Sequence, residues 1–125
     1  YAGQLIRALH AGAPIHAMAH ITGGGITENL NRALPADVDA LVYRGGEAGP
    51  AWSIPPIITY VSRLAGLTLT EAYKTFNMGV GMSIICAPED VDAVTAALKA
   101  EGLDPFLMGE CIPGTGCVQY RDDAE

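Results

Sequence analysis

The chain has 125 residues, 50% of them hydrophobic, and its seven basic and fourteen acidic residues give a formal net charge of −7. This length predicts one domain, which would bury roughly two-thirds of its unfolded surface. Without a cluster of lysine or arginine, the acidic balance argues against nucleic acid and anionic membranes as partners. Three cysteines without a Cys-x-x-Cys pair argue against a disulfide framework or a zinc site. No apolar run is long enough to span a membrane and no signal peptide opens the chain, so we expect a cytoplasmic protein.

The first half of the chain reads as alternating helices and strands. The apolar spacing predicts helices over residues 2–11 and 26–34, and strands over residues 15–21 and 39–44, the last closed by Gly45 and Gly46. Ser53 is expected to cap a further helix, which has Pro55 and Pro56 in its first turn, runs to Leu64 and ends at Gly66.

The second half continues this alternation. It predicts a short helix over 70–74, a buried strand over 79–87, a helix over 88–101 and strands near 105–111 and 116–120, with a turn at 113–116 between them. We therefore expect an α+β fold in which helices pack on a mixed sheet, with a partly ferredoxin-like passage over 79–111. Residues 1–121 would form the domain and residues 122–125 a disordered tail.

The segment from His16 to Gly25 is the most informative part of the sequence. Alternation places His16, Met18 and His20 on one side of the predicted strand. The run Thr22–Gly25 then leads into a helix. Glycines without Cβ let backbone N–H groups converge, and a helix start adds positive potential, so this turn is a candidate anion cradle. A plain tight turn and two half-buried histidines bonded to backbone carbonyls remain the alternative.

Asn77 and Gly79 form a second candidate site just before the predicted buried strand. The amide of Asn77 would reach a ligand at the sheet edge, or would form an ordinary Asx turn. Gly79 and Gly81 indicate a close backbone approach, either to a ligand or to another strand.

Four other residues have interpretations of their own. Trp52 is expected to fill the core or a domain interface rather than stack on a purine. Asp37 and Asp39 have a spacing that suits magnesium, but a solvated loop is the favoured interpretation. Glu110 would either orient a cation or face water.

The His16–Gly25 segment resembles the HAxAHxTGGG signature of the phosphoribosylformylglycinamidine cyclo-ligase family, also called aminoimidazole ribonucleotide (AIR) synthetase. Further matches follow in the family's order, at Glu28-Asn29, Arg32-Ala33-Leu34-Pro35, Trp52 with Pro55-Pro56-Ile57, Thr75 to Met82, and Gly109-Glu110. The resemblance covers nearly the whole chain, from about residue 1 to residue 120. It implies a carboxy-terminal domain of AIR synthetase truncated at its amino end, because the family's G-T-D-G-V-G-T-K and G-P-H-S-N-G segments do not occur here.

The resemblance also implies a chemistry. The family uses ATP to close the imidazole ring of formylglycinamidine ribonucleotide, giving AIR, ADP and phosphate in purine biosynthesis. Thr22, Gly23, Gly24 and Gly25 would then bind a phosphate, and His20, with His16 as a second candidate, would transfer a proton or stabilise charge. Asn77 and Gly79 would contact the substrate. ATP and magnesium would belong to the full-length enzyme, with no metal ligand in this chain, and the isolated chain would be inactive.

Other functions stay open at this point. Selenophosphate synthetase, thiamine-monophosphate kinase and a hydrogenase-maturation protein belong to the same superfamily and also phosphorylate unusual acceptors with ATP. The chain could also be a non-catalytic ligand-binding module or a self-associating scaffold. Because a truncated sheet exposes an edge strand, we expect a homodimer or a larger assembly.

Overall fold

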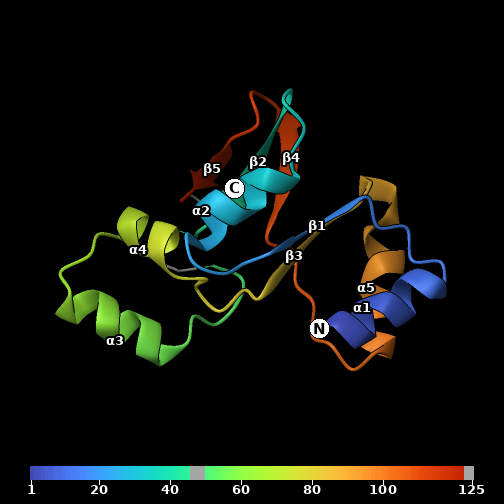
Figure 1. The fold of residues 1–125 in the computed structure, drawn as a ribbon, viewed down its shortest axis with the longest axis horizontal. Helices are drawn as coiled ribbons and strands as arrows, with labels where there is room; N and C mark the ends of the chain where they lie inside the picture. The colour runs from blue at the N-terminus through green and yellow to red at the C-terminus, as the bar shows by residue number, and fades with distance from the viewer. Residues whose placement is uncertain (46–49, 123–125) are drawn as a thin grey trace. The chain divides into compact units, whose positions relative to one another are not determined.

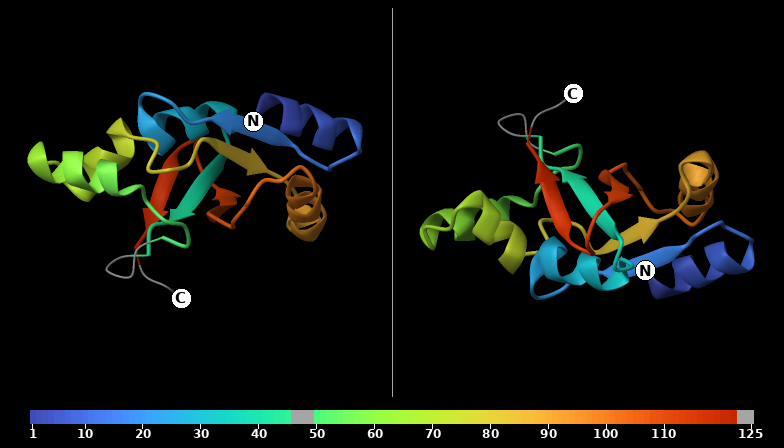
Figure 2. Two further views of the ribbon diagram at one scale, coloured as in Figure 1. Left: turned by 90° about the horizontal axis from the view of Figure 1, so that it is seen from below. Right: turned by 90° about the horizontal axis from the view of Figure 1, so that it is seen from above.

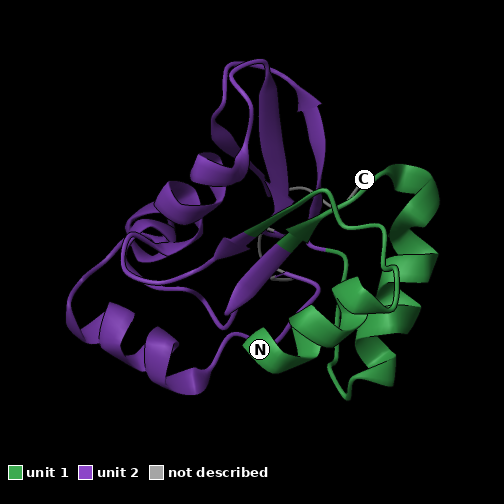
Figure 3. Cartoon of the chain, turned by 45° about the vertical axis from the view of Figure 1, so that its right-hand side comes forward, with its two compact units in different colours: residues 1–18, 84–107 green, residues 19–83, 108–125 purple. Residues whose placement is uncertain are grey.

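The computed structural model describes residues 1–45 and 50–122 (Figure 1). The fold is α+β, with helices and two separate sheets: a two-stranded sheet of β1 and β3, and a three-stranded sheet in the order β4-β2-β5. The chain divides into two compact units, a first unit of residues 1–18 and 84–107 and a second unit of residues 19–83 and 108–125 (Figure 3).

The first unit is built around a pair of helices, α1 (Ala2–His10) and α5 (Val91–Ala100). Leu5 and Ala8 of α1 are buried, as are Val94 and Leu98 of α5, so each helix buries one face at helical spacing. Arg7 Nε lies 2.6 Å from Glu101 Oε2 at the surface of this pair. Both helices confirm the sequence prediction, although a 3-10 turn over Pro88–Asp90 replaces the expected first turn of α5.

The two-stranded sheet is formed by β1 (Ala17–His20) and β3 (Met82–Ile85), and both strands run through the boundary between the units. His16 N donates to Ile85 O at 2.8 Å in the first unit, and Ile21 N donates to Gly81 O at 3.1 Å in the second. Both strands are shorter than predicted. β3 begins late because residues 77–80 form a turn, closed by Val80 N donating to Asn77 O at 2.9 Å.

The three-stranded sheet has β2 (Val38–Tyr43) at its centre, between β4 (Gly109–Pro113) and β5 (Val118–Arg121). β2 is antiparallel to β4 and parallel to β5. The predicted turn at 113–116 therefore does not join neighbouring strands, because β2 lies between β4 and β5. β3 and β4 belong to different sheets, so the ferredoxin-like passage expected over 79–111 is not confirmed.

The described part of the second unit contains the helices α2 (Gly25–Leu30), which continues as a 3-10 turn over Asn31–Ala33, α3 (Pro56–Leu64) and α4 (Leu69–Thr75). α2 contacts both β5 and α4 (Figure 2). The fully buried Ile26, Val42 and Tyr73 come from a helix, a strand and a second helix, and together they mark the core of this unit.

The helix boundaries correct one prediction. Ser53 does not cap α3, because that helix begins at Pro56 with Pro55 in the N-cap position and no side-chain cap bond. Its end is as expected, with Gly66 in the left-handed region at a φ of 65°. α4 instead carries a capping box, in which Thr68 Oγ1 accepts from Glu71 N and Glu71 Oε2 accepts from Thr68 N.

Trp52 fills the core as predicted: it is buried, and its indole Nε1 donates to Met78 O at 2.9 Å. Of the predicted tail, Asp122 accepts two hydrogen bonds from Arg44. Residues 123–125 and Gly46 lie outside the described residues. No helix within the described ranges is long and apolar enough to cross a membrane.

Asp39 overturns the prediction of a solvated loop. It lies in β2, is 4% exposed, and accepts from Thr115 N at 2.7 Å and Cys117 N at 2.8 Å, as well as from the side-chain amide of Gln119. These donors, the two backbone amides foremost, hold the pKa of Asp39 below its ordinary value. Through these hydrogen bonds the Asp39 carboxylate fixes the connection between β4 and β5 on β2. Asp37 is exposed.

We predict that Asp39→Asn destabilises the fold, because an amide NH₂ group would face N–H donors. The lowered pKa means that the charged Asp39 stabilises the fold above pH 3.8, its unfolded value, and loses that contribution as the pH falls. The melting temperature of the variant should therefore lie below that of the wild type at neutral pH and approach it in acid. Thermal melts monitored by circular dichroism measure this, with the exposed neighbour Asp37→Asn as control. Equal melting temperatures for the two variants at neutral pH would contradict the role of Asp39.

Candidate functional site

The glycine turn Thr22–Gly25 connects β1 to α2 in the second unit. Thr22 and Gly23 are exposed, and Gly25 N donates to Thr22 O at 3.1 Å to close the turn. Gly24 and Gly25 both have left-handed backbones, with φ values of 92° and 63°. The predicted turn into a helix is therefore present, and it depends on two glycines.

Asn29, buried in α2, holds this turn from behind. Its Nδ2 donates to Gly23 O at 3.0 Å and to Gly25 O at 2.8 Å, with a longer contact to Thr22 O. Because C=O and N–H point in opposite directions across a trans peptide, the amides of Gly23 and Gly24 point away from Asn29. Within the described part of the chain, no backbone carbonyl accepts from these two amides. The turn therefore presents two backbone donors on its exposed side.

Asn29 is a residue that the sequence reasoning missed. It stands in the Glu28-Asn29 pair of the family resemblance, and this was the one signal that could have identified it. Its amide also accepts from Thr22 Oγ1 at 3.4 Å. The side chain of Asn29 therefore fixes the conformation of the turn through contacts within the protein.

Gly25 allows the turn to pack closely against the end of α4. A Cβ at this position would meet Tyr73 O and would lie 2.7 Å from Phe76 O, which is far inside van der Waals contact. No larger residue fits without moving α2 away from α4. This contact also brings the turn next to the segment that contains Asn77.

Asn77 and Gly79 have clear structural roles. Asn77 Oδ1 accepts from Gly79 N at 2.9 Å, which is the Asx turn considered above. Gly79 has a φ of 91°, and a Cβ there would lie 2.6 Å from Pro55 Cδ, so the close approach is to the protein itself. Contact of either residue with substrate stays a prediction.

Both predicted histidines are exposed, and so is Met18 between them, whereas Ala19 and Ile21 are buried. The alternation predicted for this strand is therefore confirmed. His20 lies in the second unit, two residues before Thr22, whereas His16 lies in the first unit. His20, the glycine turn and Asn77 thus all belong to the second unit.

Glu28 opposes an anion at the turn. Its carboxylate lies directly over Gly24, where an added Cβ would collide with Glu28 Oε2. A negative charge this close to the two free amides repels a bare anion. An anionic ligand must therefore displace Glu28 or interact with it favourably through a second group.

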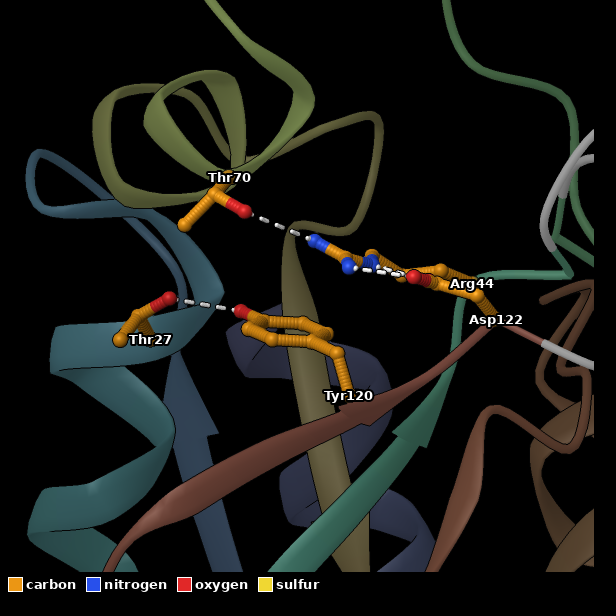
Figure 4. A network of polar contacts seen from close by, with 5 residues as sticks. All are labelled: Thr27, Arg44, Thr70, Tyr120 and Asp122. Carbon is orange, nitrogen blue, oxygen red and sulfur yellow. Dashed lines mark hydrogen bonds and ion pairs between the residues drawn. The ribbon is translucent and has the colours of Figure 1, made fainter.

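A second polar cluster, which the sequence analysis did not foresee, lies around Arg44 at the end of β2 (Figure 4). Its guanidinium donates to both carboxylate oxygens of Asp122, at 2.6 and 2.8 Å, and to Thr70 Oγ1 at 3.4 Å. It also lies 4.8 Å from the ring centroid of Tyr120, whose hydroxyl is 2.7 Å from Thr27 Oγ1. The cluster connects β2, β5, α2 and α4, and Asp122 neutralises Arg44, so it stabilises the unit rather than binding anions.

Tyr73 packs edge-on against Tyr120, with ring centroids 5.1 Å apart. Its hydroxyl is buried without a hydrogen-bond partner in the described structure, and burial raises the pKa of Tyr73 to about 12. Because the unfolded phenol ionises near pH 10.0, stability is lost as the pH rises from 10.0 towards 12.

No group of three or more His, Cys, Asp or Glu side chains that could hold a metal ion occurs within residues 1–45 and 50–122. The spacing of Asp37 and Asp39 does not make a magnesium site, because the carboxylate of Asp39 is occupied by protein donors.

The fold and the site define an α+β domain in which a glycine turn, held by a buried asparagine, faces solvent between a strand and a short helix. Residues 2–120 match the family described as AIR synthase related protein, C-terminal domain, and the chain belongs to this family. It is 38% identical over 116 residues to a phosphoribosylformylglycinamidine cyclo-ligase of Xanthomonas oryzae pv. oryzae (strain PXO99A), covering 90% of this chain and 31% of the relative. It is 41% identical over 107 residues to a protein of the same name from Caldanaerobacter subterraneus subsp. tengcongensis, covering 86% of this chain and 30% of that relative. The chain thus spans about a third of the length of these relatives.

We predict that Gly25→Ala destabilises the second unit by about 2 kcal/mol or more, because the added Cβ meets two carbonyl oxygens in a left-handed backbone. Gly23→Ala is the matched control: no atom lies within 4 Å of its added Cβ. Its cost should stay within about 0.5 kcal/mol. Urea unfolding of the two variants measures the difference, and similar costs would contradict the seating of Gly25 on α4.

We predict opposite effects of removing the two neighbouring tyrosine hydroxyls. Tyr73→Phe should leave stability unchanged or raise it, because a buried unpartnered hydroxyl is removed. It should also reduce the stability loss between pH 10.0 and 12, while Tyr120 and Tyr43, whose pKa values burial also raises, keep their share of that loss. Tyr120→Phe breaks the bond to Thr27 and should cost about 1 kcal/mol. Chemical unfolding at neutral and alkaline pH tests both variants. A larger loss for Tyr73→Phe than for Tyr120→Phe at neutral pH would refute this assignment.

Proposed function

We propose that this chain is the carboxy-terminal part of an ATP-dependent cyclo-ligase that converts formylglycinamidine ribonucleotide to AIR, ADP and phosphate in purine biosynthesis. The family match and the two relatives that carry the cyclo-ligase name support this proposal. Because the chain spans about a third of those relatives, the complete reaction needs residues beyond the ones described here. The isolated chain would be inactive, and the enzyme would act in the cytoplasm.

The observation that carries the proposal is the pair of amides at Gly23 and Gly24. The carbonyls of Thr22 and Gly23 are fixed by Asn29, so both N–H groups are held outward before any ligand arrives. Preorganised donors of this kind suit a phosphate, because they need no rearrangement on binding. In this proposal the turn holds the phosphate of the ribonucleotide.

Glu28 fits this substrate better than it fits inorganic phosphate. Its carboxylate repels the phosphate charge, but it can accept hydrogen bonds from an N–H-rich group such as an amidine. Formylglycinamidine ribonucleotide carries both a phosphate and an amidine. The turn and Glu28 together would therefore favour a ligand with both groups over a bare anion.

His20 would move the proton. ATP supplies the phosphoryl group that turns the formyl oxygen of the substrate into a leaving group. When the substrate nitrogen attacks the formyl carbon, it must lose a proton, and an exposed imidazole near the turn suits this step. His16 remains a second candidate, and Asn77 would donate its free amide N–H groups to a polar part of the substrate.

ATP and magnesium would bind mainly to parts of the enzyme outside this chain. The described residues contain no group of three or more His, Cys, Asp or Glu side chains that could hold magnesium. We further propose that the complete enzyme is a homodimer or a larger assembly.

The test is a titration of the ¹⁵N-labelled chain with formylglycinamidine ribonucleotide, inorganic phosphate and ATP. We expect saturable shifts of the Gly23 and Gly24 amides with the ribonucleotide, and weaker ones with phosphate. Glu28→Gln should strengthen phosphate binding several-fold while strengthening ribonucleotide binding less, because only the ribonucleotide can use the carboxylate. In the full-length enzyme, His20→Ala should lower kcat/KM by about 10²-fold or more, with His10→Ala as the control.

Two results would contradict the proposal. Ribonucleotide-induced shifts that spare residues 22–25 would remove the turn from the binding site. An unchanged kcat/KM in the His20→Ala enzyme would remove the histidine from the reaction, even if the turn binds phosphate.

A further inference from the structure

The turn that carries Asn77 has a strained backbone. Val80 N donates to Asn77 O at 2.9 Å, and the two residues between them, Met78 and Gly79, are both left-handed, with φ values of 54° and 91°. Glycine adopts this conformation readily, whereas a residue with a long side chain, such as Met78, rarely does. Among the described residues, Met78 is the one non-glycine residue with a positive φ. Such a conformation persists only where the surrounding structure holds it.

Trp52 holds Met78 in this conformation. Its ring is buried, and its Nε1 donates to Met78 O at 2.9 Å. An indole has one N–H donor and no acceptor, so this hydrogen bond fixes a single direction for the carbonyl of Met78. Without the bond, Met78 could relax towards the negative φ values at which a residue with a Cβ is unstrained.

One peptide group connects Trp52 to Asn77. The carbonyl of Met78 and the N–H of Gly79 belong to the same trans peptide and therefore point in opposite directions. On one side the carbonyl accepts from Trp52, and on the other side the N–H donates to Asn77 Oδ1 at 2.9 Å. The two hydrogen bonds thus form a relay from the indole through the peptide to the side-chain amide. Hydrogen bonds in such a chain polarise and strengthen one another.

The relay also orients the Nδ2 group of Asn77. The side-chain amide is planar, so a hydrogen bond that fixes Oδ1 fixes the direction of Nδ2 as well. Within residues 1–45 and 50–122, Nδ2 of Asn77 has no protein acceptor. The preceding residue is held too, because Phe76 O packs against Gly25 of the glycine turn. Asn77 therefore presents two oriented donors from a segment that packs against the glycine turn.

We propose that Trp52 is a positioning residue for substrate binding, which acts through the peptide between Met78 and Gly79 to hold the Nδ2 group of Asn77 towards the substrate. This inference rests on the proposed function, in which Asn77 binds a polar part of the ribonucleotide. Because Trp52 is buried, it acts through Asn77 rather than on the ligand. Its effect should therefore appear in the KM for the ribonucleotide, and should disappear when the side chain of Asn77 is removed.

The first test examines the turn without a ligand. Trp52→Phe keeps an aromatic ring but loses the N–H donor, so the amide of Val80, which closes the turn, should exchange with solvent about 3-fold faster or more. Tyr73→Phe is the matched control, since it also removes one polar group from a buried ring of the second unit, and it should leave this rate unchanged. An unchanged rate in Trp52→Phe would overturn the hold on the turn, whatever the protein binds.

The second test is a double-mutant cycle in the full-length enzyme. Asn77→Ala should raise the KM for the ribonucleotide by about 10-fold, and Trp52→Phe should raise it by about 3-fold with little change in kcat. The double variant should be no worse than Asn77→Ala alone, because Trp52 acts only through Asn77. A general weakening of the fold would instead add to the effect of Asn77→Ala. Tyr73→Phe should leave KM unchanged, and circular dichroism checks that each variant folds.

The outcomes separate this inference from the function on which it rests. Additive effects of Trp52→Phe and Asn77→Ala, or a KM that Trp52→Phe does not change, would overturn the positioning role of Trp52 while Asn77 stays in the site. If Asn77→Ala alone changed neither KM nor kcat, the proposed contact of Asn77 with the substrate would fail, and the positioning role would fail with it.

Discussion

The second unit depends on the close approach of Gly25 to the carbonyl oxygens of Tyr73 and Phe76. A Cβ at residue 25 would overlap both backbone groups, so α2 can lie against the end of α4 only because this residue is glycine. That contact fixes α2, which in turn buries Ile26 and places Thr27 against the hydroxyl of Tyr120 on β5. One backbone position therefore sets the distance between the helices and, through Tyr120, their position on the sheet.

The same contact explains why the glycine turn is ordered without a ligand. With α2 fixed, Asn29 is buried and its Nδ2 donates hydrogen bonds to the carbonyl oxygens of the turn. The carbonyls point inward, so the donors must point outward. Net charge has little influence on this arrangement, because exposed charges are screened over about 8 Å at physiological salt. Glu28 is the exception, since its carboxylate lies directly over Gly24. In the proposed anion site, one neighbouring side chain would therefore matter more than the overall charge of −7.

Local patterns in the sequence were enough to predict most elements, and also the shared side on which His20 of β1 and His16, just before β1, lie. Alternation and helical spacing depend only on residues that are close in the chain, and the elements predicted from them largely agree with the structure. The wrong predictions concern contacts between distant segments. Asp39 lies two residues after the exposed Asp37 in sequence, and only the hydrogen bonds from residues 115–119 make it a buried acceptor. The separation of β3 and β4 into two sheets and the role of Asn29 have the same origin, since neither leaves a periodic signal.

The exposed features of the second unit differ in how firmly the protein holds them. Asn29 and the end of α4 fix the glycine turn from behind, so its donors would meet a ligand without an ordering cost. Helix α3 buries none of its own residues, so packing within the unit holds it less firmly than it holds the turn. The segment that leads into α3 still contacts the site, because Pro55 lies against Gly79 and the amide of Gly79 donates to Asn77 Oδ1 in the Asx turn.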